Sequence, residues 1–313
     1  MRILITGGLG FIGSYFAEKL SNSAEKIIIL DNKTGFSLSG ENILLTKPNI
    51  KIYDVDIVSS DIDEYFKNID IVYHFAANSK ISEGVNNPNI DFDITVRGTQ
   101  KVLNAMKKSS VNQIVFSSGS GVYGDQKETI LGEDFGPLLP VSYYGASKLA
   151  AEAMISSFCG MSGFKAFIFR FANVVGLRQT HGVAYDFVNK LKIQPKNLEV
   201  LGNGMQSKSY IDVEDIFNGI ELAIKKQVTN IDVYNISTQD YIDVRNIAKE
   251  VIKEMNLSDV KINYGEDSFG WVGDVPIVRF SSDKIRKMGW SNKYSSQEAI
   301  QRAVKFILSD DNS

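Results

Sequence analysis

Short apolar runs alternate along the chain with longer segments in which apolar positions recur every three or four residues. The run RILIT at 2–6, for example, is followed by a segment with helical spacing at 11–21. Runs of this length predict buried strands, and the spaced segments predict amphipathic helices. The expected strands are 2–6, 26–30, 50–53, 69–75, 113–117 and 166–170, and the expected helices are 11–21, 91–109 and 143–160.

Strands that alternate with helices in this order fold as a parallel sheet covered on both faces. We therefore predict an α/β protein whose residues 1–175 form a doubly wound parallel sheet, a Rossmann fold. After this point the alternation loosens, and we expect residues 176–313 to form mainly a smaller α/β lobe that binds the substrate, with some chain crossing between the lobes. The short strands and amphipathic helices assigned to this lobe are 198–201, 233–236, 213–226 and 243–255.

Composition and charge limit the classes of partner. Of the 313 residues, 43% are hydrophobic and 23% are charged, the formal net charge is −3, and no block of basic residues is present. We therefore expect no nucleic-acid partner, and because no apolar stretch approaches the length of a membrane span, no membrane partner. The first residues run directly into a strand rather than into the pattern of a secretory signal. A cytoplasmic location is the resulting expectation.

The scarcity of metal ligands argues against a metal centre. The chain contains two histidines, His74 and His181, and one cysteine, Cys159. A structural zinc site takes about four such ligands, so we expect no metal. Because His74 lies on a predicted strand, a Ser-His-Asp hydrolase is also disfavoured, and Cys159 is expected to be a small packing residue.

A glycine-rich turn follows the first strand and opens the first helix. Gly7, Gly10 and Gly13 have the spacing GxxGxxG. Glycine permits a tight turn and lets a pyrophosphate approach backbone N–H groups at the helix N-terminus, where the helix dipole favours negative charge. Asp31 ends the second strand about 20 residues further on, as the dinucleotide-binding fingerprint requires.

The residue at position 31 indicates which dinucleotide is bound. The Asp31 carboxylate can accept hydrogen bonds from both ribose hydroxyls of NAD and would repel the 2′-phosphate of NADP, and no arginine stands beside it. NAD is therefore the predicted cofactor. Asp56 and Ile57, after the third strand, are candidates for contact with the adenine ring. The other cofactor contacts expected from the glycine turn and the strand ends are Phe11, Ile12, Asn32 and Ser117.

Tyr144 and Lys148 are the candidate catalytic pair. Their spacing of four places the phenol and the ammonium on one face of a helix. A nearby positive charge favours phenolate over phenol, so we expect a lowered pKa for Tyr144, in the direction a general base requires.

The motifs taken together resemble one enzyme family. They are TGGLGFIG at 6–13, LDN at 30–32, HFAA at 74–77, SSGSGVYGD at 117–125, YYGASK at 143–148 and RFANVVG at 170–176, with GNGMQSKSYIDVED at 202–215 and WVGDVP at 271–276. The chain resembles the extended short-chain dehydrogenase/reductases, most closely the UDP-glucose (UDP-galactose) 4-epimerases.

The resemblance implies roles for further residues. Phe75, Ala76 and Ala77 would line the path of NAD, Lys148 would also hold the nicotinamide ribose, and Asn173 would contact the substrate diphosphate. In such epimerases the tyrosine takes the proton of the sugar 4-hydroxyl while C4 gives hydride to NAD. The 4-ketosugar then turns over and takes the hydride back on its other face. The family also pairs the helices near 91–109 and 143–160 across a two-fold axis, so a homodimer is expected.

One departure from the family pattern concerns the third catalytic residue. The family usually carries a Ser or Thr that hydrogen-bonds the reacting hydroxyl at the position of Gly119. Ser118 and Ser120 flank this glycine, and either hydroxyl, or a water, could take over the role. We select Ser118 as the third candidate catalytic residue.

Further departures concern the substrate and the cofactor helix. Lys208 and Trp271 stand where two arginines usually grip the diphosphate, and Thr95 stands where an asparagine braces the cofactor helix. Lysine keeps the positive charge but loses the bidentate geometry of arginine, and tryptophan loses both. Arg178 and His181, near the entrance of the lobe, are the possible replacements. The expected substrate contacts are Asn173, His181, Lys208 and Asp274.

An NAD-dependent 4-epimerase of a nucleotide-linked hexose is the leading hypothesis. Sugar 4,6-dehydratases place an acidic pair after their catalytic threonine, whereas this chain has Ser120 and Gly121 there, which disfavours dehydration. Two alternatives stay open: another enzyme that modifies NDP-sugars, namely a dehydratase, decarboxylase or reductase, and a non-catalytic NAD-binding regulator. The intact Tyr144 and Lys148 pair speaks against the regulator.

Overall fold

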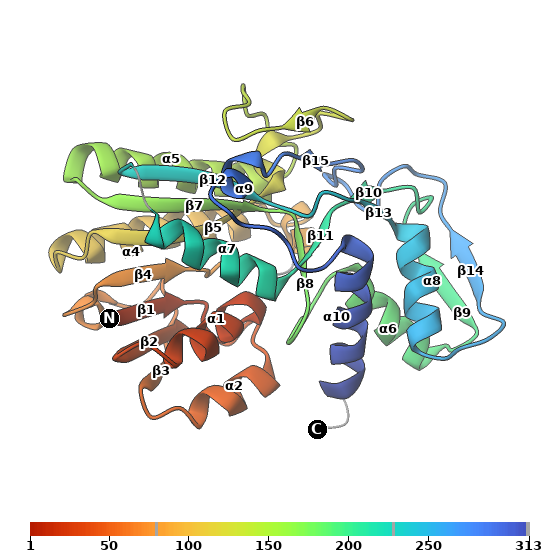
Figure 1. Cartoon of the computed structure of the whole chain (residues 1–313), viewed down its shortest axis with the longest axis horizontal. Coiled ribbons are helices and arrows are strands. Elements are labelled where there is room, and N and C mark those ends of the chain that lie inside the picture. The colour runs from red at the N-terminus through yellow and green to blue at the C-terminus, as the bar shows by residue number, and fades with distance from the viewer. Residues whose placement is uncertain (79–80, 227–228, 311–313) are drawn as a thin grey trace.

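A seven-stranded parallel sheet forms the centre of the molecule (Figure 1). The structure is a computed structural model, and it describes residues 1–78, 81–226 and 229–310. The strand order is β12-β7-β5-β4-β1-β2-β3. Its strands are β1 (Arg2–Thr6), β2 (Lys26–Asp31), β3 (Ile50–Asp54), β4 (Ile71–His74), β5 (Gln113–Gly119), β7 (Lys165–Phe171) and β12 (Ile231–Ile236). The predicted doubly wound α/β fold is confirmed.

Two apolar layers cover the two faces of this sheet, as expected for strands buried on both sides. One layer contains α1 (Phe11–Ser21) and α7 (Val213–Lys225), with α2 (Leu38–Leu45) packed against α1. The other contains α4 (Gly98–Lys108) and α5 (Tyr143–Ser162). Short segments complete the sheet half of the chain: η1 (Asp63–Phe66), η2 (Ile81–Val85), α3 (Asn89–Asp91), η3 (Phe92–Arg97), η4 (Ser120–Tyr123), β6 (Ile130–Leu131), β15 (Arg279–Phe280) and α9 (Asp283–Lys287).

A smaller lobe packs beside the carboxyl ends of the strands, on the right of Figure 1. A separate apolar core holds its helices together. Its elements are β8 (Asn173–Val175), α6 (Val183–Ile193), β9 (Asn197–Val200), β10 (Ser207–Lys208), β11 (Tyr210–Asp212), β13 (Ile242–Asp243), α8 (Val244–Glu254), β14 (Lys261–Tyr264) and α10 (Ser296–Asp310).

One part of the predicted division between the lobes is wrong. The helix near 213–226 and the strand near 233–236 were assigned to the substrate lobe, but they are α7 and β12. β12 pairs in parallel with β7 at the edge of the main sheet, and α7 packs in the same apolar layer as α1. Strand order in space is set by pairing and not by sequence order, so an amphipathic pattern alone does not reveal which sheet a late strand joins.

The start of α5 is fixed by its first turn. Ser142 is the N-cap, and its hydroxyl oxygen accepts a hydrogen bond from the Gly145 N–H at 3.1 Å. Gly163, with φ of +69°, ends the helix in the left-handed region that glycine adopts at low cost. These ends set the helix register and thereby place Tyr144 in its first turn and Lys148 in its second.

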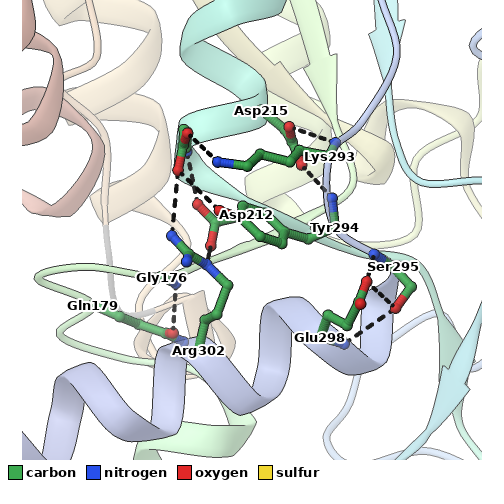
Figure 2. Close-up of polar contacts among 10 residues, drawn as sticks. Gly176, Gln179, Asp212, Asp215, Lys293, Tyr294, Ser295, Glu298 and Arg302 are labelled. Atoms are coloured by element: carbon green, nitrogen blue, oxygen red, sulfur yellow. Dashed lines mark hydrogen bonds and ion pairs between the residues drawn. The ribbon is translucent and has the colours of Figure 1, made fainter.

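A polar cluster fastens the C-terminal helix α10 to the sheet half of the molecule (Figure 2). Arg302 donates to Asp212 at 3.0 Å and to Glu214 at 3.3 Å, and its guanidinium lies 3.9 Å from the centroid of the Tyr294 ring. Asp212 also caps α7 by accepting the Glu214 N–H. The Asp212 side chain is only 2% exposed, so Arg302 supplies the positive charge that a buried carboxylate requires.

Among the residues that the structure describes, no helix combines the length and the apolar character that crossing a membrane would demand.

We expect Arg302→Ala to destabilise the fold. Removal of the guanidinium leaves the buried Asp212 carboxylate without its counter-charge, at a cost of about 2–3 kcal/mol in the free energy of unfolding. Lys305→Ala on the same helix is the matched control, because the Lys305 side chain is 66% exposed, and it should change the free energy by less than about 0.5 kcal/mol. Urea unfolding measures both, and equal effects of the two substitutions would contradict this role of Arg302.

Candidate active site

A cavity of about 1040 Å³ runs along the carboxyl ends of the parallel strands, between the sheet and the smaller lobe. Open α/β sheets bind their ligands at this edge. All predicted cofactor, substrate and catalytic residues except Arg178, the possible replacement for the missing arginines, border this one cavity. They are Gly7, Gly10, Phe11, Ile12, Gly13, Asp31, Asn32, Asp56, Ile57, Phe75, Ala76, Ala77, Ser117, Ser118, Tyr144, Lys148, Asn173, His181, Lys208 and Asp274.

The glycine turn between β1 and α1 forms one wall of the cavity. Gly7 has φ of +68°, and a Cβ built on it would lie 2.7 Å from the backbone nitrogen of Ala76, so neither the dihedral angle nor the space admits a side chain. A Cβ on Gly13 would come closer still to the Gly7 carbonyl oxygen. The turn therefore presents bare backbone at the N-terminus of α1, where a pyrophosphate is favoured.

Asp31 lies at the end of β2 and is 8% exposed. Its two oxygens accept the N–H groups of Leu9, at 2.9 Å, and of Lys33, at 2.8 Å, so the carboxylate is held in place by the glycine turn and by its own loop. Burial raises the pKa of Asp31, and these two hydrogen bonds oppose the rise. The ammonium of Lys33 pairs with Glu41 at 2.7 Å, so the nearest cation is already neutralised.

Tyr144 and Lys148 lie together on α5, beside the end of β5. The Lys148 ammonium is 2% exposed, donates to the Ser117 carbonyl oxygen at 2.7 Å, and lies 4.9 Å and 5.6 Å from the ring centroids of Phe116 and Tyr144. Burial lowers the pKa of Lys148 to about 7, although carboxylates nearby act to raise it. The pKa of Lys148 thus lies close to neutral pH.

The pKa of Tyr144 moves in the direction opposite to the prediction. Burial raises it, and the carboxylate of Asp91 adds to the rise. The sequence showed the lysine four residues away, but it showed neither the desolvation of the phenol nor the buried Asp91 carboxylate, and these two effects set the direction of the shift.

Comparisons with known proteins agree with this geometry. Residues 3–237 match the model of the NAD dependent epimerase/dehydratase family. The chain is 31% identical over 312 residues to a putative UDP-glucose 4-epimerase of Methanocaldococcus jannaschii, with 97% of this chain and 98% of that protein covered. It is 28% identical over 319 residues to human dTDP-D-glucose 4,6-dehydratase, covering 97% of this chain and 89% of that protein.

A crystal structure of a UDP-galactose 4-epimerase superposes with a TM-score of 0.88 at 30% identity, covering 99% of each chain. The chain belongs to the NAD-dependent epimerase/dehydratase family. The predicted membership of the extended short-chain dehydrogenase/reductases is therefore confirmed. The predicted cofactor is confirmed by similar structures that contain NAD, among them the NAD complex of a Thermus thermophilus UDP-glucose 4-epimerase, which is 27% identical with a TM-score of 0.86 and covers 98% of this chain and 99% of that chain. NAD also fits the residues present, since the side-chain-free turn at Gly7 and the fixed Asp31 carboxylate meet the needs of a pyrophosphate and an unphosphorylated ribose.

The hydroxyl predicted to complete the epimerase/dehydratase site is already engaged. Although Ser118 borders the cavity, its Oγ donates to the Glu152 carboxylate at 2.5 Å. Glu152 in turn accepts two hydrogen bonds from Arg170, at 2.7 Å and 3.1 Å, and all three side chains are buried. This network lies on the far side of β5 from the Ser117 side chain, because successive residues of a strand point to opposite faces. Ser118 therefore has a structural task that the sequence did not reveal.

Ser120 is the hydroxyl that remains. It borders the cavity at the start of η4, and within the described part of the chain its Oγ has no hydrogen-bond partner. Gly119 has no side chain, and the Ser117 hydroxyl donates to the His74 carbonyl oxygen at 3.4 Å.

The cavity wall contributed mainly by the smaller lobe carries the predicted substrate contacts. Lys208 pairs with Asp274 at 2.6 Å, and both side chains are mostly buried. Asn173 and His181 border the same wall, and so does Trp271. Arg178, considered as a replacement for the missing arginines, is wrong for that role: it is buried, pairs with Glu18 and donates to the Ser14 carbonyl oxygen at 3.1 Å, so it joins the lobe to α1.

The sequence did not predict that two polar residues near the start of the 91–109 region are buried. Asp91, which the sequence did not single out, is 1% exposed and accepts a hydrogen bond from Asn78, which itself borders the cavity. Thr95, at the position of the family's bracing asparagine, is fully buried, and its hydroxyl has no hydrogen-bond partner among the described residues. Both lie in a segment predicted as a plain helix, where a polar residue reads as solvent-facing, and the wider turn of η3 gave no sequence signal.

We expect Asp31→Asn to weaken the preference for NAD. The amide replaces one of the two acceptor oxygens by a donor and removes the charge that repels a 2′-phosphate, so NADH should bind about tenfold more weakly while NADPH gains relative to it. Asp54→Asn, at the exposed end of the neighbouring strand and outside the cavity, is the matched control. Fluorescence titration with both nucleotides measures the ratio, and an equal loss for both would contradict this role of Asp31.

Proposed function

We propose that the protein is an NAD-dependent epimerase that inverts C4 of a UDP-linked hexose, interconverting UDP-glucose and UDP-galactose. The observation that carries the proposal is the continuity of the cavity. It extends from the glycine turn and Asp31, past Tyr144 and Lys148, to Lys208 and Asp274 of the far wall. A dinucleotide from one end and a nucleotide sugar from the other would therefore meet at the Tyr144 phenol.

The residues at this meeting point have complementary tasks. As a phenolate, the Tyr144 Oη would accept the proton of the sugar 4-hydroxyl and become a phenol. The Lys148 ammonium, held by the Ser117 carbonyl oxygen, stabilises the phenolate before this transfer and again after the proton has returned to the sugar. When bound, NAD supplies a reversible hydride acceptor. The proton returns after the 4-ketosugar has turned over in the cavity, so the product differs only in configuration at C4.

The walls near Tyr144 are compatible with such a rotation. Ala77, Gly119, Gly121 and Ala172 border the cavity with small or absent side chains. A hexose would be held mainly through its nucleotide and diphosphate. Lys208 is the cation available for the diphosphate, and its pairing with Asp274 means that the substrate must share or displace this partner.

An epimerase is favoured over a dehydratase by the residues that follow β5. Elimination of water needs an additional acid and base close to the sugar, and Ser120 and Gly121 supply neither a carboxylate nor another group of suitable pKa. The homodimer remains part of the proposal. The helical regions expected at its interface carry large exposed apolar side chains, with Phe92 53% and Met161 88% exposed.

The Tyr144→Phe variant tests the proposal. Purified protein should interconvert UDP-galactose and UDP-glucose without net consumption of NAD, and the variant should lose about 10²–10⁴-fold in turnover while nucleotide binding is retained. Proton NMR of the sugar anomeric region measures the reaction, with UDP-N-acetylglucosamine, UDP-glucuronate and dTDP-glucose as further substrates.

Three results would contradict this assignment. Loss of water or of carbon dioxide from a substrate would indicate a dehydratase or a decarboxylase. Stoichiometric use of added NADH would indicate a reductase. Binding of NAD without turnover of any of these substrates would favour the alternative hypothesis of a non-catalytic NAD-binding regulator.

Two serine variants separate the candidate third residues. Ser120→Ala should lower the turnover number about 10²-fold with little change in the free energy of unfolding, because it removes a hydroxyl that faces the cavity. Ser118→Ala should instead cost about 1–3 kcal/mol of stability, because it removes a donor from the buried Glu152 carboxylate. Turnover and urea unfolding are measured for both, and the reverse pattern would restore Ser118 as the catalytic residue.

A further inference from the structure

Among the residues that the structure describes, no carboxylate forms a hydrogen bond or an ion pair with the buried ammonium of Lys148. Its hydrogen-bond acceptor is the Ser117 carbonyl oxygen, and its other near neighbours are the faces of Phe116 and Tyr144. These groups are neutral. A buried cation without a counter-charge tends to lose its proton, so the charge on Lys148 depends on anions in the next layer of residues.

Two carboxylates are near enough to act on Lys148. Glu152, one turn further along α5, is the first. It is committed to Arg170 through two hydrogen bonds and a salt bridge of 2.7 Å, and it also accepts the Ser118 hydroxyl. The pair of Glu152 and Arg170 carries no net charge, so its effect on Lys148 is partly cancelled.

Asp91 is the second carboxylate, and within the described residues no cation forms an ion pair with it. It is 1% exposed and ends α3, which packs with η3 against α5. Its Oδ1 accepts a hydrogen bond from the Asn78 amide at 3.1 Å, but its Oδ2 is buried and has no hydrogen-bond partner in the described part of the chain. Gly84 lies so close to this oxygen that a Cβ would collide with it.

A carboxylate in this state is costly to bury, and its cost falls only if a positive charge is near. The other titratable groups that pack around Lys148 do not supply one. His74 of β4 is fully buried between the hydroxyls of Thr6 and Thr99, at 2.6 Å and 3.0 Å, and burial lowers its pKa to about 3, so it is neutral. Tyr144 is itself neutral at physiological pH because its pKa is raised.

We propose that Asp91 is the counter-charge of Lys148, a positioning residue that keeps the ammonium protonated inside the catalytic site. The two groups stabilise each other where α3 packs on α5. The positive charge of Lys148 lowers the free-energy cost of burying the unpaired Oδ2 of Asp91, and the negative charge of Asp91 lowers the cost of burying the ammonium. The inference deepens the proposed function, since a charged Lys148 is what the Tyr144 base requires, but the charge state of Lys148 can be measured without any substrate.

The sign of the effect follows from electrostatics. Removal of a negative charge makes every neighbouring protonated group easier to deprotonate, so it lowers the pKa of Lys148 and of Tyr144 together. The pH profile of turnover should therefore move as a whole toward acid. A purely structural defect would lower turnover without moving the profile.

Asp91→Asn is the decisive variant, because the amide keeps the size of the side chain and removes its charge. Asp93→Asn is the matched control: it lies two residues further on, is 41% exposed, pairs with Arg97 on the surface and does not border the cavity. Lysine labelled with ¹³C at Cε reports the protonation of Lys148 by NMR, and a Lys148→Met sample identifies its signal. All samples are compared in the same nucleotide-bound state.

Lys148 should titrate near pH 7 in the unaltered protein and about one pH unit lower in Asp91→Asn, with no shift in Asp93→Asn. Both limbs of the pH profile should shift by a similar amount. An unchanged midpoint in Asp91→Asn overturns the proposal, as does a fall in turnover without a shift. If Asp91→Asn fails to fold by circular dichroism, Asp91→Ser replaces it. If no epimerase activity exists, the NMR midpoint still decides.

Discussion

The hydrogen bond from the Lys148 ammonium to the Ser117 carbonyl oxygen fixes the geometry on which the catalytic end of the site depends. It joins the second turn of α5 to the end of β5 over 2.7 Å in a buried setting. A charged donor that is shielded from water cannot exchange this acceptor cheaply, so the helix cannot slide along the sheet. Tyr144 lies one turn before the bond and Glu152 one turn after it. This one contact therefore positions both the Tyr144 phenol and the Glu152 carboxylate, which accepts the hydrogen bond from Ser118.

Desolvation, more than proximity, governs the charges at this contact. Burial raises the pKa of Tyr144 and lowers that of Lys148, while the Asp91 carboxylate acts to raise both. Around them His74 is neutral, and Glu152 and Arg170 neutralise each other. In this poorly solvated interior the charge of Asp91 therefore has a large effect on Lys148. Such an interior suits an enzyme that has to hold a phenolate only while its substrate is present.

The sequence predicted the local features well because they depend on neighbours in the chain. The spacing of Gly7, Gly10 and Gly13 requires bare backbone whatever surrounds it, and Asp31 follows from the end of its strand. The features it missed depend on partners far along the chain. Ser118 is bound to Glu152, 34 residues away, and Arg178 to Glu18, 160 residues away. A motif indicates which residues lie at the site, but not which of their side chains are already hydrogen-bonded to residues elsewhere in the chain.

The return of the chain to the main sheet has a consequence for how the molecule holds together. β12 covers the outer edge of β7 through a register of six paired residues, after the chain has passed through the smaller lobe. A chain cut at residue 175 would leave the outer edge of β7 without its paired strand, and an unpaired edge of buried apolar residues favours aggregation. The smaller lobe is therefore joined to the main sheet both where the chain enters the lobe and where the chain returns from it as β12.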